Sequence, residues 1–250
     1  MNILVCISRV PDTAARIMVG SDGKTIDKQN VKFIINPYDE FAIEEALRLK
    51  EKLGGEPVVT AISVSHEDAK EQLRTALAMK VDRTVYIKSA EALDSFQVAY
   101  NLAEFAKELK PDLIFLGRQS VDYDSLQIPS MLGELMGIPS VSVVSGLKVD
   151  SHKITAERDI EGGRETVEAP MPCIVSAQKG LNEPRYPKLP DIMKAKSKPI
   201  EEIDAKPTDP RVSVLSMEIP SKQRLGKMFA DSQEDVDNLV KLLHEEAKVI

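Results

Sequence analysis

Residues 32–64 read KFIINPYDEFAIEEALRLKEKLGGEPVVTAISV, in which two short apolar runs flank a segment of helical periodicity. Asn36-Pro37 supplies a helix N-cap followed by a proline at the first helical position, and Gly54-Gly55 ends the periodic segment. Between these signals apolar residues recur every three or four positions. The stretch therefore predicts a strand, a helix and a second strand, which is the repeating unit of a helix-covered parallel sheet.

The same alternation continues through the first 145 residues. We predict strands at residues 2–8, 32–35, 57–64, 83–87, 112–116 and 140–144, and further helices at 66–79, 90–109 and 127–136. Beyond them, short strands at 147–149, 154–159 and 165–169, with a turn at Gly162-Gly163, would extend the sheet antiparallel, and 173–177 is another apolar strand.

Residues 180–210 are rich in Lys and Pro and show little apolar periodicity, so we expect an extended arm over the surface. Residues 232–247 return to a helical pattern, with Ser232 as a cap and one apolar face. This helix either packs on a partner protein or folds back to close its own domain. The sequence thus predicts an α/β fold with a doubly wound, mostly parallel sheet, an antiparallel extension and a long C-terminal arm ending in a helix.

Composition narrows the classes of function. Of the 250 residues 42% are hydrophobic, and the formal net charge of -7 argues against binding nucleic acid. Aromatic residues make up 4%, without Trp, which disfavours an aromatic sugar platform and a base-stacking surface. Cys6 and Cys173 lie in apolar strands, so we expect buried free thiols in a reducing compartment. The chain starts on a strand, and no apolar run approaches the roughly 20 residues of a membrane span; we expect a cytoplasmic protein without membrane insertion.

Three loops follow strand ends and are candidates for a ligand crevice: residues 8–12, 36–39 and 117–127. In an open parallel sheet the ligand binds beyond the carboxyl ends of the strands, where the strand order reverses. The second loop also opens a helix, whose free N–H groups favour an anion.

The third loop carries the most chemistry. Gly117 permits a sharp exit from the strand, and Arg118 can neutralise a phosphate. The remaining polar side chains are the hydroxyls of Ser120 and Ser125 and the carboxylates of Asp122 and Asp124. Neither a Walker sequence nor a G-x-G-x-x-G motif is present. The loop is therefore a candidate nucleotide site, or else an Asx-rich turn that caps a helix.

No catalytic constellation emerges from the sequence. The histidines, His66, His152 and His244, are scattered along the chain and form neither a metal cluster nor a triad. Glu157, Asp159 and Glu161 alternate along a predicted strand and could form an acid pair, but with Arg158 on the other face a solvated strand edge explains them better.

Several segments resemble the electron-transfer flavoprotein β subunit family: residues 36–51, 73–83, 157–163 and 181–196, with similarity over essentially the whole chain. The resemblance implies an adenine-nucleotide-hydrolase-like α/β domain that docks on an α subunit, whose C-terminal domain carries the redox-active FAD. It also implies a noncatalytic electron carrier that accepts electrons from acyl-CoA dehydrogenases, as in fatty acid oxidation, and passes them to a quinone-linked oxidoreductase. By the same resemblance, residues 1–180 form the nucleotide-binding domain, 181–210 the recognition loop and arm, and 211–250 a segment that packs on the partner.

The resemblance also assigns residues. Leu189 matches the apolar plug that enters a pocket on the dehydrogenase, and Asp159 matches an acidic position that helps hold the mobile flavin domain. The crevice that holds AMP in the family matches Cys6, Ser8, Arg9, Asn36, Pro37, Tyr38, Asp39, Val64, Arg118, Gln119, Ser120, Val121, Asp122, Asp124, Ser125 and Gln127.

One departure leaves the crevice ligand open. Ile128-Pro129 stands where the family holds the AMP phosphate, and proline lacks an N–H while isoleucine lacks a hydroxyl. Residues 10–13 look more like the flavin-bifurcating branch of the family, in which a second FAD replaces AMP. A stand-alone nucleotide-sensing domain is a third interpretation, which predicts a stable monomer without flavin.

Overall fold

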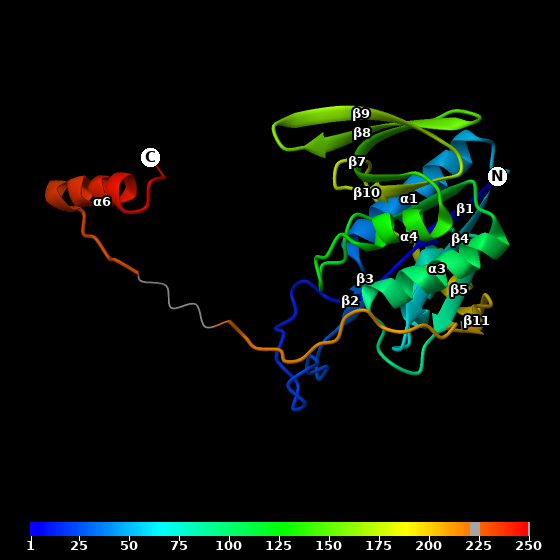
Figure 1. Ribbon diagram of the computed structural model, residues 1–250, viewed down its shortest axis with the longest axis horizontal. Coiled ribbons are helices and arrows are strands. Elements are labelled where there is room, and N and C mark those ends of the chain that lie inside the picture. The colour runs from blue at the N-terminus through cyan, green and yellow to red at the C-terminus, as the bar shows by residue number, and fades with distance from the viewer. Residues whose placement is uncertain (221–225, 250) are drawn as a thin grey trace.

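In the computed structural model of the chain, which describes residues 1–220 and 226–249, the strand β1 (Asn2–Cys6) is buried on two faces (Figure 1). Ile3 and Val5 belong to one hydrophobic cluster, whereas Leu4 and Cys6 belong to another. Because successive side chains of a strand point to opposite faces, the continuous apolar run supplies two cores at once.

The main sheet surrounds β1. Its other strands are β4 (Val58–Ser65), β5 (Arg83–Lys88), β6 (Leu113–Gly117), β7 (Ser140–Val149), β8 (Lys153–Ile160), β9 (Gly163–Pro170), β10 (Cys173–Ala177) and β11 (Glu201–Asp204). Among the described residues the order is β11-β5-β4-β1-β6-β10-β7-β8-β9. Pairing is parallel from β11 to β7 and antiparallel from β7 to β9. The predicted mostly parallel sheet with an antiparallel extension is confirmed, although residues 147–149 continue β7 and do not form a separate strand.

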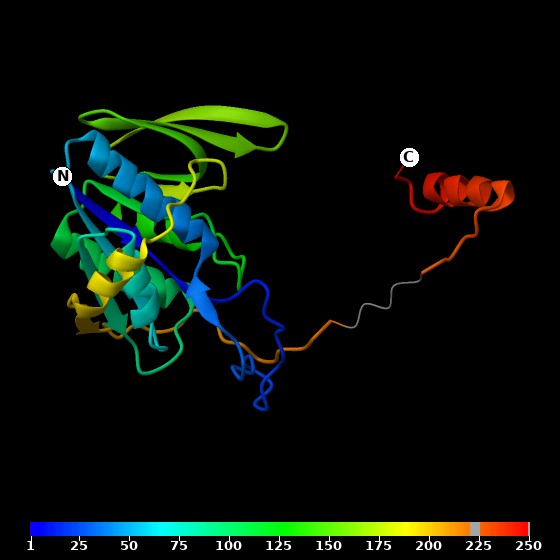
Figure 2. The same cartoon turned by 180° about the vertical axis from the view of Figure 1, so that it is seen from behind.

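Helices cover both faces of the sheet (Figures 1 and 2). The helices α1 (Pro37–Lys52) and α2 (Lys70–Ala78) pack on one face, and α3 (Ser95–Leu109) and α4 (Ile128–Met136) pack on the other. Buried residues of α1, such as Ala42 and Ile43, join the cluster of Ile3, whereas Leu102 of α3 joins the cluster of Leu4. Helices therefore pack on both faces of the sheet, which confirms the predicted doubly wound arrangement.

Two helices begin later than predicted, each directly after a turn that a side-chain hydrogen bond stabilises. The helix α2 starts at Lys70 and not at residue 66. Asp68 Oδ1 accepts from Lys70 N at 3.0 Å in the turn before it, and the cap residue Ala69 makes no side-chain capping bond. Asp94 and Gln97 form a reciprocal capping box, which fixes the start of α3 at Ser95 and not at residue 90.

The strand predicted at residues 32–35 is present, but the prediction that it belongs to the parallel sheet is wrong. The strand β3 (Phe33–Ile35) instead pairs antiparallel with β2 (Arg9–Pro11) in a small second sheet. β4 and β6 occupy the two edges of β1, so β3 has no ladder position beside it.

Residues 180–210 contain more regular structure than the sequence predicts. The helix α5 (Leu189–Ser197) packs on α2 through Ala195, which contacts Leu77 and Ala78, and β11 adds to the sheet beside β5. In α5, which lies wholly within the described residues, Ala195 is the one buried residue. The sequence therefore lacks the repeated buried apolar positions from which a helix is predicted.

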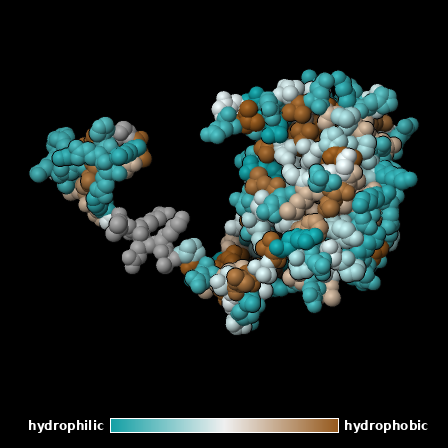
Figure 3. Space-filling model, in the orientation of Figure 1, coloured by the Kyte–Doolittle hydropathy of each residue, from teal (hydrophilic) through white to brown (hydrophobic). Residues whose placement is uncertain are grey.

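The C-terminal helix α6 (Gln233–Glu245) confirms the predicted helix and its cap, since Ser232 Oγ accepts from Asp235 N at 3.1 Å. None of its residues is buried, and it lies apart from the sheet in Figure 1. Figure 3 shows hydrophobic atoms where the chain leaves the body. Val212 and Leu215, in the arm that precedes α6, are exposed. Within the predicted segment 211–250, residues 221–225 and 250 lie outside the described residues. No described helix is long and apolar enough to cross a membrane.

Candidate functional site

A crevice lies at the carboxyl ends of β1 and β6, where the sheet reverses its order: the chain builds β4 and β5 on one side of β1 before it crosses to β6 on the other. This is the topological switch point at which open α/β sheets bind ligands. Counting the space open to solvent, the crevice encloses about 540 Å³.

The structure brings together nine of the residues predicted for this site. They are Cys6, Ser8, Asp39, Val64, Arg118, Gln119, Ser120, Ser125 and Gln127. The other predicted residues lie beside the crevice without lining it: Arg9, Asn36, Pro37, Tyr38, Val121, Asp122 and Asp124.

Asp39 joins the ends of the two strands. Its buried carboxylate accepts from the backbone N of Ser8 at 2.7 Å and from that of Gly117 at 2.8 Å. Burial raises the pKa of Asp39 to about 7, although these hydrogen bonds act to lower it. The crevice is therefore lined by a carboxyl group that gains or loses its proton near neutral pH.

Gly117 is required for close packing and not, as predicted, for a sharp exit from the strand. A Cβ at this position would collide with Asp39 Oδ1 and would come within 2.6 Å of Tyr38 Cβ. The start of α1 therefore presses directly against the end of β6.

Asn36 fixes the loop that follows β6, although its side chain does not cap α1 as predicted. Its Nδ2 donates to Gln119 O at 2.8 Å, and its Oδ1 accepts from Val121 N at 3.2 Å. Asp124 Oδ1 accepts from Gln119 Nε2, and Asp124 itself adopts a left-handed backbone conformation. These contacts order the loop from one strand end to the next helix.

Arg118 is the one cation among the described residues that line the crevice. Its partners in the described part of the chain are neutral: Gln119 Oε1 at 2.5 Å, Gln178 Oε1 at 3.4 Å and the ring of Tyr38. Arg9, by contrast, lies over the Phe33 ring at 3.4 Å and pairs with Glu67 at 3.8 Å. Arg118 therefore holds a positive charge that an anionic ligand can neutralise.

The start of α4 closes the crevice on its far side. Ile128 and Pro129 both line it, and the cap residue Gln127 makes no side-chain capping bond. Pro129 has no N–H, so this helix terminus offers fewer backbone donors to an anion than an ordinary one. With Arg118 as the one cation among the described lining residues, and the serines Ser120 and Ser125 in the same loop, the crevice suits a single phosphate better than a pyrophosphate.

Sequence reasoning missed the apolar wall of the crevice. Val98 and Leu102 of α3 line it, together with Ile62 of β4. Their sequence signal is the ordinary apolar periodicity of a core helix, which does not reveal that apolar residues in the first half of α3 line the crevice.

The two remaining predicted residues lie on other surfaces. Leu189 is the first residue of α5 and is 72% exposed. Asp159 lies on β8, where it pairs with Arg164 at 2.9 Å and accepts from Ser145 Oγ at 3.3 Å. Within the described ranges, no group of three or more His, Cys, Asp or Glu side chains could hold a metal ion.

Cys6 and Cys173 are buried free thiols, as predicted. Burial raises the pKa of Cys173 to about 11 and also raises the pKa of Cys6, which lines the crevice. Cys6 thus presents a neutral, weakly polar surface there.

Comparison with known proteins gives one consistent result. The profile named "Electron transfer flavoprotein domain" matches residues 23–208. The electron transfer flavoprotein subunit beta of Bacillus subtilis is 41% identical over 261 aligned positions, which cover all of both chains. The mouse protein of the same name is 38% identical over 100% of this chain and 99% of its own, and the human one is 39% identical over 94% and 95%.

Proposed function

The chain belongs to the electron transfer flavoprotein family as a β subunit, and hence as an electron carrier and not an enzyme, and from that premise we propose that its crevice binds AMP beside a flavin-bearing α subunit. The observation that carries the AMP proposal is Arg118, a cation with neutral partners whose loop also brings the serines Ser120 and Ser125 to the crevice. One cation fits one phosphate.

Different residues of the crevice would bind the phosphate and the adenine of AMP. Arg118, Ser120 and Ser125 would hold the phosphate, and the apolar wall of Ile62, Val98 and Leu102 would take the adenine face. Burial keeps the thiol of Cys6 neutral, so this lining residue is a weak nucleophile. AMP would therefore serve as a structural element of the subunit.

The α subunit would hold most of the FAD, which when bound supplies the redox chemistry of the complex. Asp159 lies on the antiparallel extension, and its charge would help to hold the mobile flavin domain of the partner. The unburied α6 and the exposed arm that precedes it provide further apolar surface for that subunit.

The proposed donors are acyl-CoA dehydrogenases, and the proposed acceptor is a quinone-linked oxidoreductase, which places the carrier in fatty acid oxidation. Leu189 supports the donor assignment, because an exposed leucine between Lys188 and Pro190 can bury its side chain in a pocket of a partner. Two free buried thiols agree with the cytoplasm as the proposed setting.

The test is the ligand content of the heterodimer purified with its α subunit. We expect one FAD and one AMP per heterodimer, measured by mass spectrometry of the released ligands. Two FAD and no AMP would instead establish the flavin-bifurcating alternative. One FAD without AMP would leave the carrier assignment intact but refute the nucleotide assignment of the crevice.

A further inference from the structure

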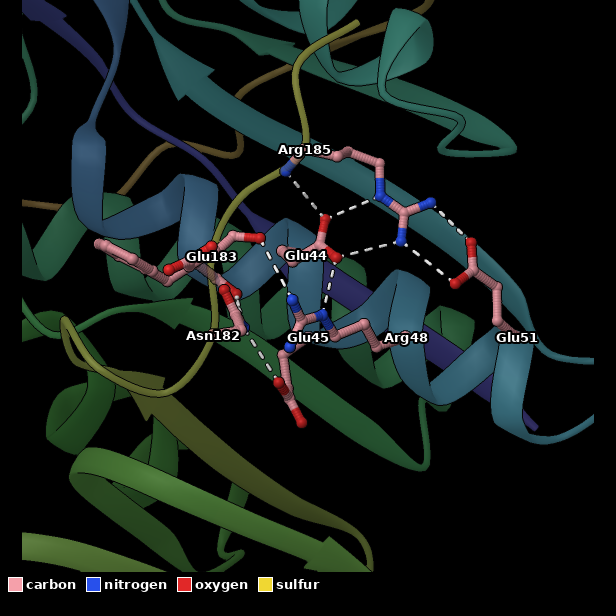
Figure 4. A network of polar contacts seen from close by, with 8 residues as sticks. Glu44, Glu45, Arg48, Glu51, Asn182, Glu183 and Arg185 are labelled. Atoms are coloured by element: carbon pink, nitrogen blue, oxygen red, sulfur yellow. Dashed lines mark hydrogen bonds and ion pairs between the residues drawn. The ribbon is translucent and has the colours of Figure 1, made fainter.

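Arg185 clamps the chain just before α5 onto α1 (Figure 4). Its Nε donates to Glu44 Oε2 at 2.8 Å, its NH2 to Glu44 Oε1 at 3.1 Å and its NH1 to Glu51 Oε1 at 2.6 Å. Its backbone N also donates to Glu44 Oε2 at 3.2 Å. The guanidinium therefore engages two carboxylates about two helical turns apart, which fixes both its position and its plane.

Neighbouring residues of the same network hold the chain that leads into the clamp. Asn182 Nδ2 donates to Phe41 O and to Glu45 Oε2, both at 2.9 Å. Arg48 pairs with Glu44 at 2.8 Å and also donates to Glu183 O at 3.4 Å. Residues 182–185 are thus bound to α1 at several points.

A second arginine holds the other end of α5. Arg74, on α2, donates through NH1 to Ala195 O at 3.1 Å and to Lys196 O at 2.7 Å. These carbonyls belong to the last turn of α5, where a cation also complements the helix dipole. Ala195 is buried against α2 beside them.

Between the two arginines, the outer face of α5 has no cover among the described residues. Leu189 is 72% exposed and Met193 58%, and Ile192 lies beside them at the spacing of one helical face. Tyr186, just outside the clamp, is 94% exposed. The structure thus fixes the ends of a short helix and leaves its apolar face available.

We propose that Arg74 and Arg185 are positioning residues, which hold the Leu189 helix in the geometry that the electron donor binds. A carboxylate such as Glu44, with a 4% exposed side chain, loses much of its hydration, so its pairing with two arginines adds little net stability. Its effect is orientation. A helix held at both ends is already in its bound form, which lowers the entropic cost of docking.

The proposal rests on the proposed function and is tested by a double-mutant cycle in the intact heterodimer. Arg185→Gln and Arg74→Gln should each raise the apparent KM for the carrier with an acyl-CoA dehydrogenase, and leave kcat and flavin content unchanged. If α5, once an arginine contact is lost, adopts its bound geometry for about a tenth to a third of the time, the apparent KM rises about three- to tenfold. In a Leu189→Ala background the same substitutions should add no further rise.

Arg83→Gln is the matched control, because Arg83 pairs with Glu201 on β11 at the same edge of the sheet without touching α5. It should leave KM unchanged. Hydrogen exchange of residues 186–197 should accelerate in the Arg74 and Arg185 variants but not in the control.

Three outcomes separate the two claims. If Leu189→Ala leaves KM unchanged, the donor-docking part of the proposed function fails. If Leu189→Ala raises KM while the arginine variants do not, or if their effects persist without Leu189, the positioning role alone is refuted. Should Arg185→Gln lose flavin through misfolding, Glu51→Gln tests the same clamp at an exposed acceptor, and an unchanged KM there and in Arg74→Gln overturns the proposal.

Discussion

The carboxylate of Asp39 occupies the space into which a side chain at Gly117 would extend. The two residues are 78 positions apart in the sequence, yet Gly117 N donates to Asp39 Oδ1 at 2.8 Å. Gly117→Ala should therefore push α1 away from β6 and lower the free energy of unfolding by about 1 to 3 kcal/mol, the usual effect of overpacking. Chemical denaturation measures this loss.

Gly163→Ala is the control for that experiment, because a Cβ there meets nothing within 4 Å. It should leave the unfolding free energy within about 0.5 kcal/mol of the wild type. Equal losses in both variants would contradict the packing role of Gly117.

Asp39 should make stability fall as the pH rises. Its pKa is raised from 3.8 to about 7 in the folded chain, so the unfolded state releases this proton first. The difference in unfolding free energy between wild type and Asp39→Asn, which does not titrate, should therefore shrink from about pH 4 to about pH 7 and then stay level. Denaturation at several pH values checks this, and a difference that does not change with pH would refute the raised pKa.

Arg118→Gln should reduce the AMP retained by the purified heterodimer without changing its FAD content. The substitution removes the cation of the crevice but keeps a polar side chain of similar length, and loss of a charge-assisted hydrogen bond costs about 1.5 to 3 kcal/mol, or at least tenfold in affinity. Calorimetric titration with AMP measures it directly. Arg83→Gln, which lies at the opposite end of the strands, should bind AMP as the wild type does.

The two carboxylate oxygens of Asp94 have different partners, the start of α3 and the arm at residues 211–212. Two substitutions can separate the effects of these contacts. Asp94 Oδ1 caps α3 through Gln97 N, and Asp94 Oδ2 accepts from the backbone N of Arg211 and Val212. Asp94→Ala should cost about 1 kcal/mol of stability through the lost cap and also release the arm. Asp94→Asn keeps one acceptor for the cap, so it should release the arm at nearly unchanged stability. Limited proteolysis around residue 212 and thermal denaturation measure the two effects, and equal protease resistance in all three proteins would show that Asp94 does not hold the arm.

Local signals in the sequence were sufficient for much of the fold. Pro37 and Gly54 mark the two ends of α1, and the apolar runs of β1, β4 and β6 predict strands buried on both sides. The crevice loops were predictable because each follows the end of a strand, and the family resemblance points to the same loops. What sequence reasoning got wrong depends on distant partners. The place of β3 depends on which strands occupy the edges of β1. The position of α5 depends on contacts between residues more than 100 positions apart, Arg74 with Ala195 and Arg185 with Glu44.

Side chains that the sequence assigned to the ligand illustrate the same limit. Asn36 was predicted to cap a helix and touch a nucleotide, but its amide is bound to Gln119 and Val121 of a loop more than 80 positions away. Arg9 was expected in the crevice, but Phe33 and Glu67 hold it aside. Residue type alone does not distinguish a polar group that binds a ligand from one that binds the fold.

The two outermost strands of the sheet carry charge along their length, with Glu201, Glu202 and Asp204 on β11 and Arg164, Glu165 and Glu168 on β9. An open strand edge is a template for pairing with another chain, and charged side chains on a short edge strand oppose it. A subunit that is translated before its partner reaches it would otherwise be at risk of aggregation through these edges. The charged edges therefore favour assembly through specific side-chain surfaces over indiscriminate strand addition.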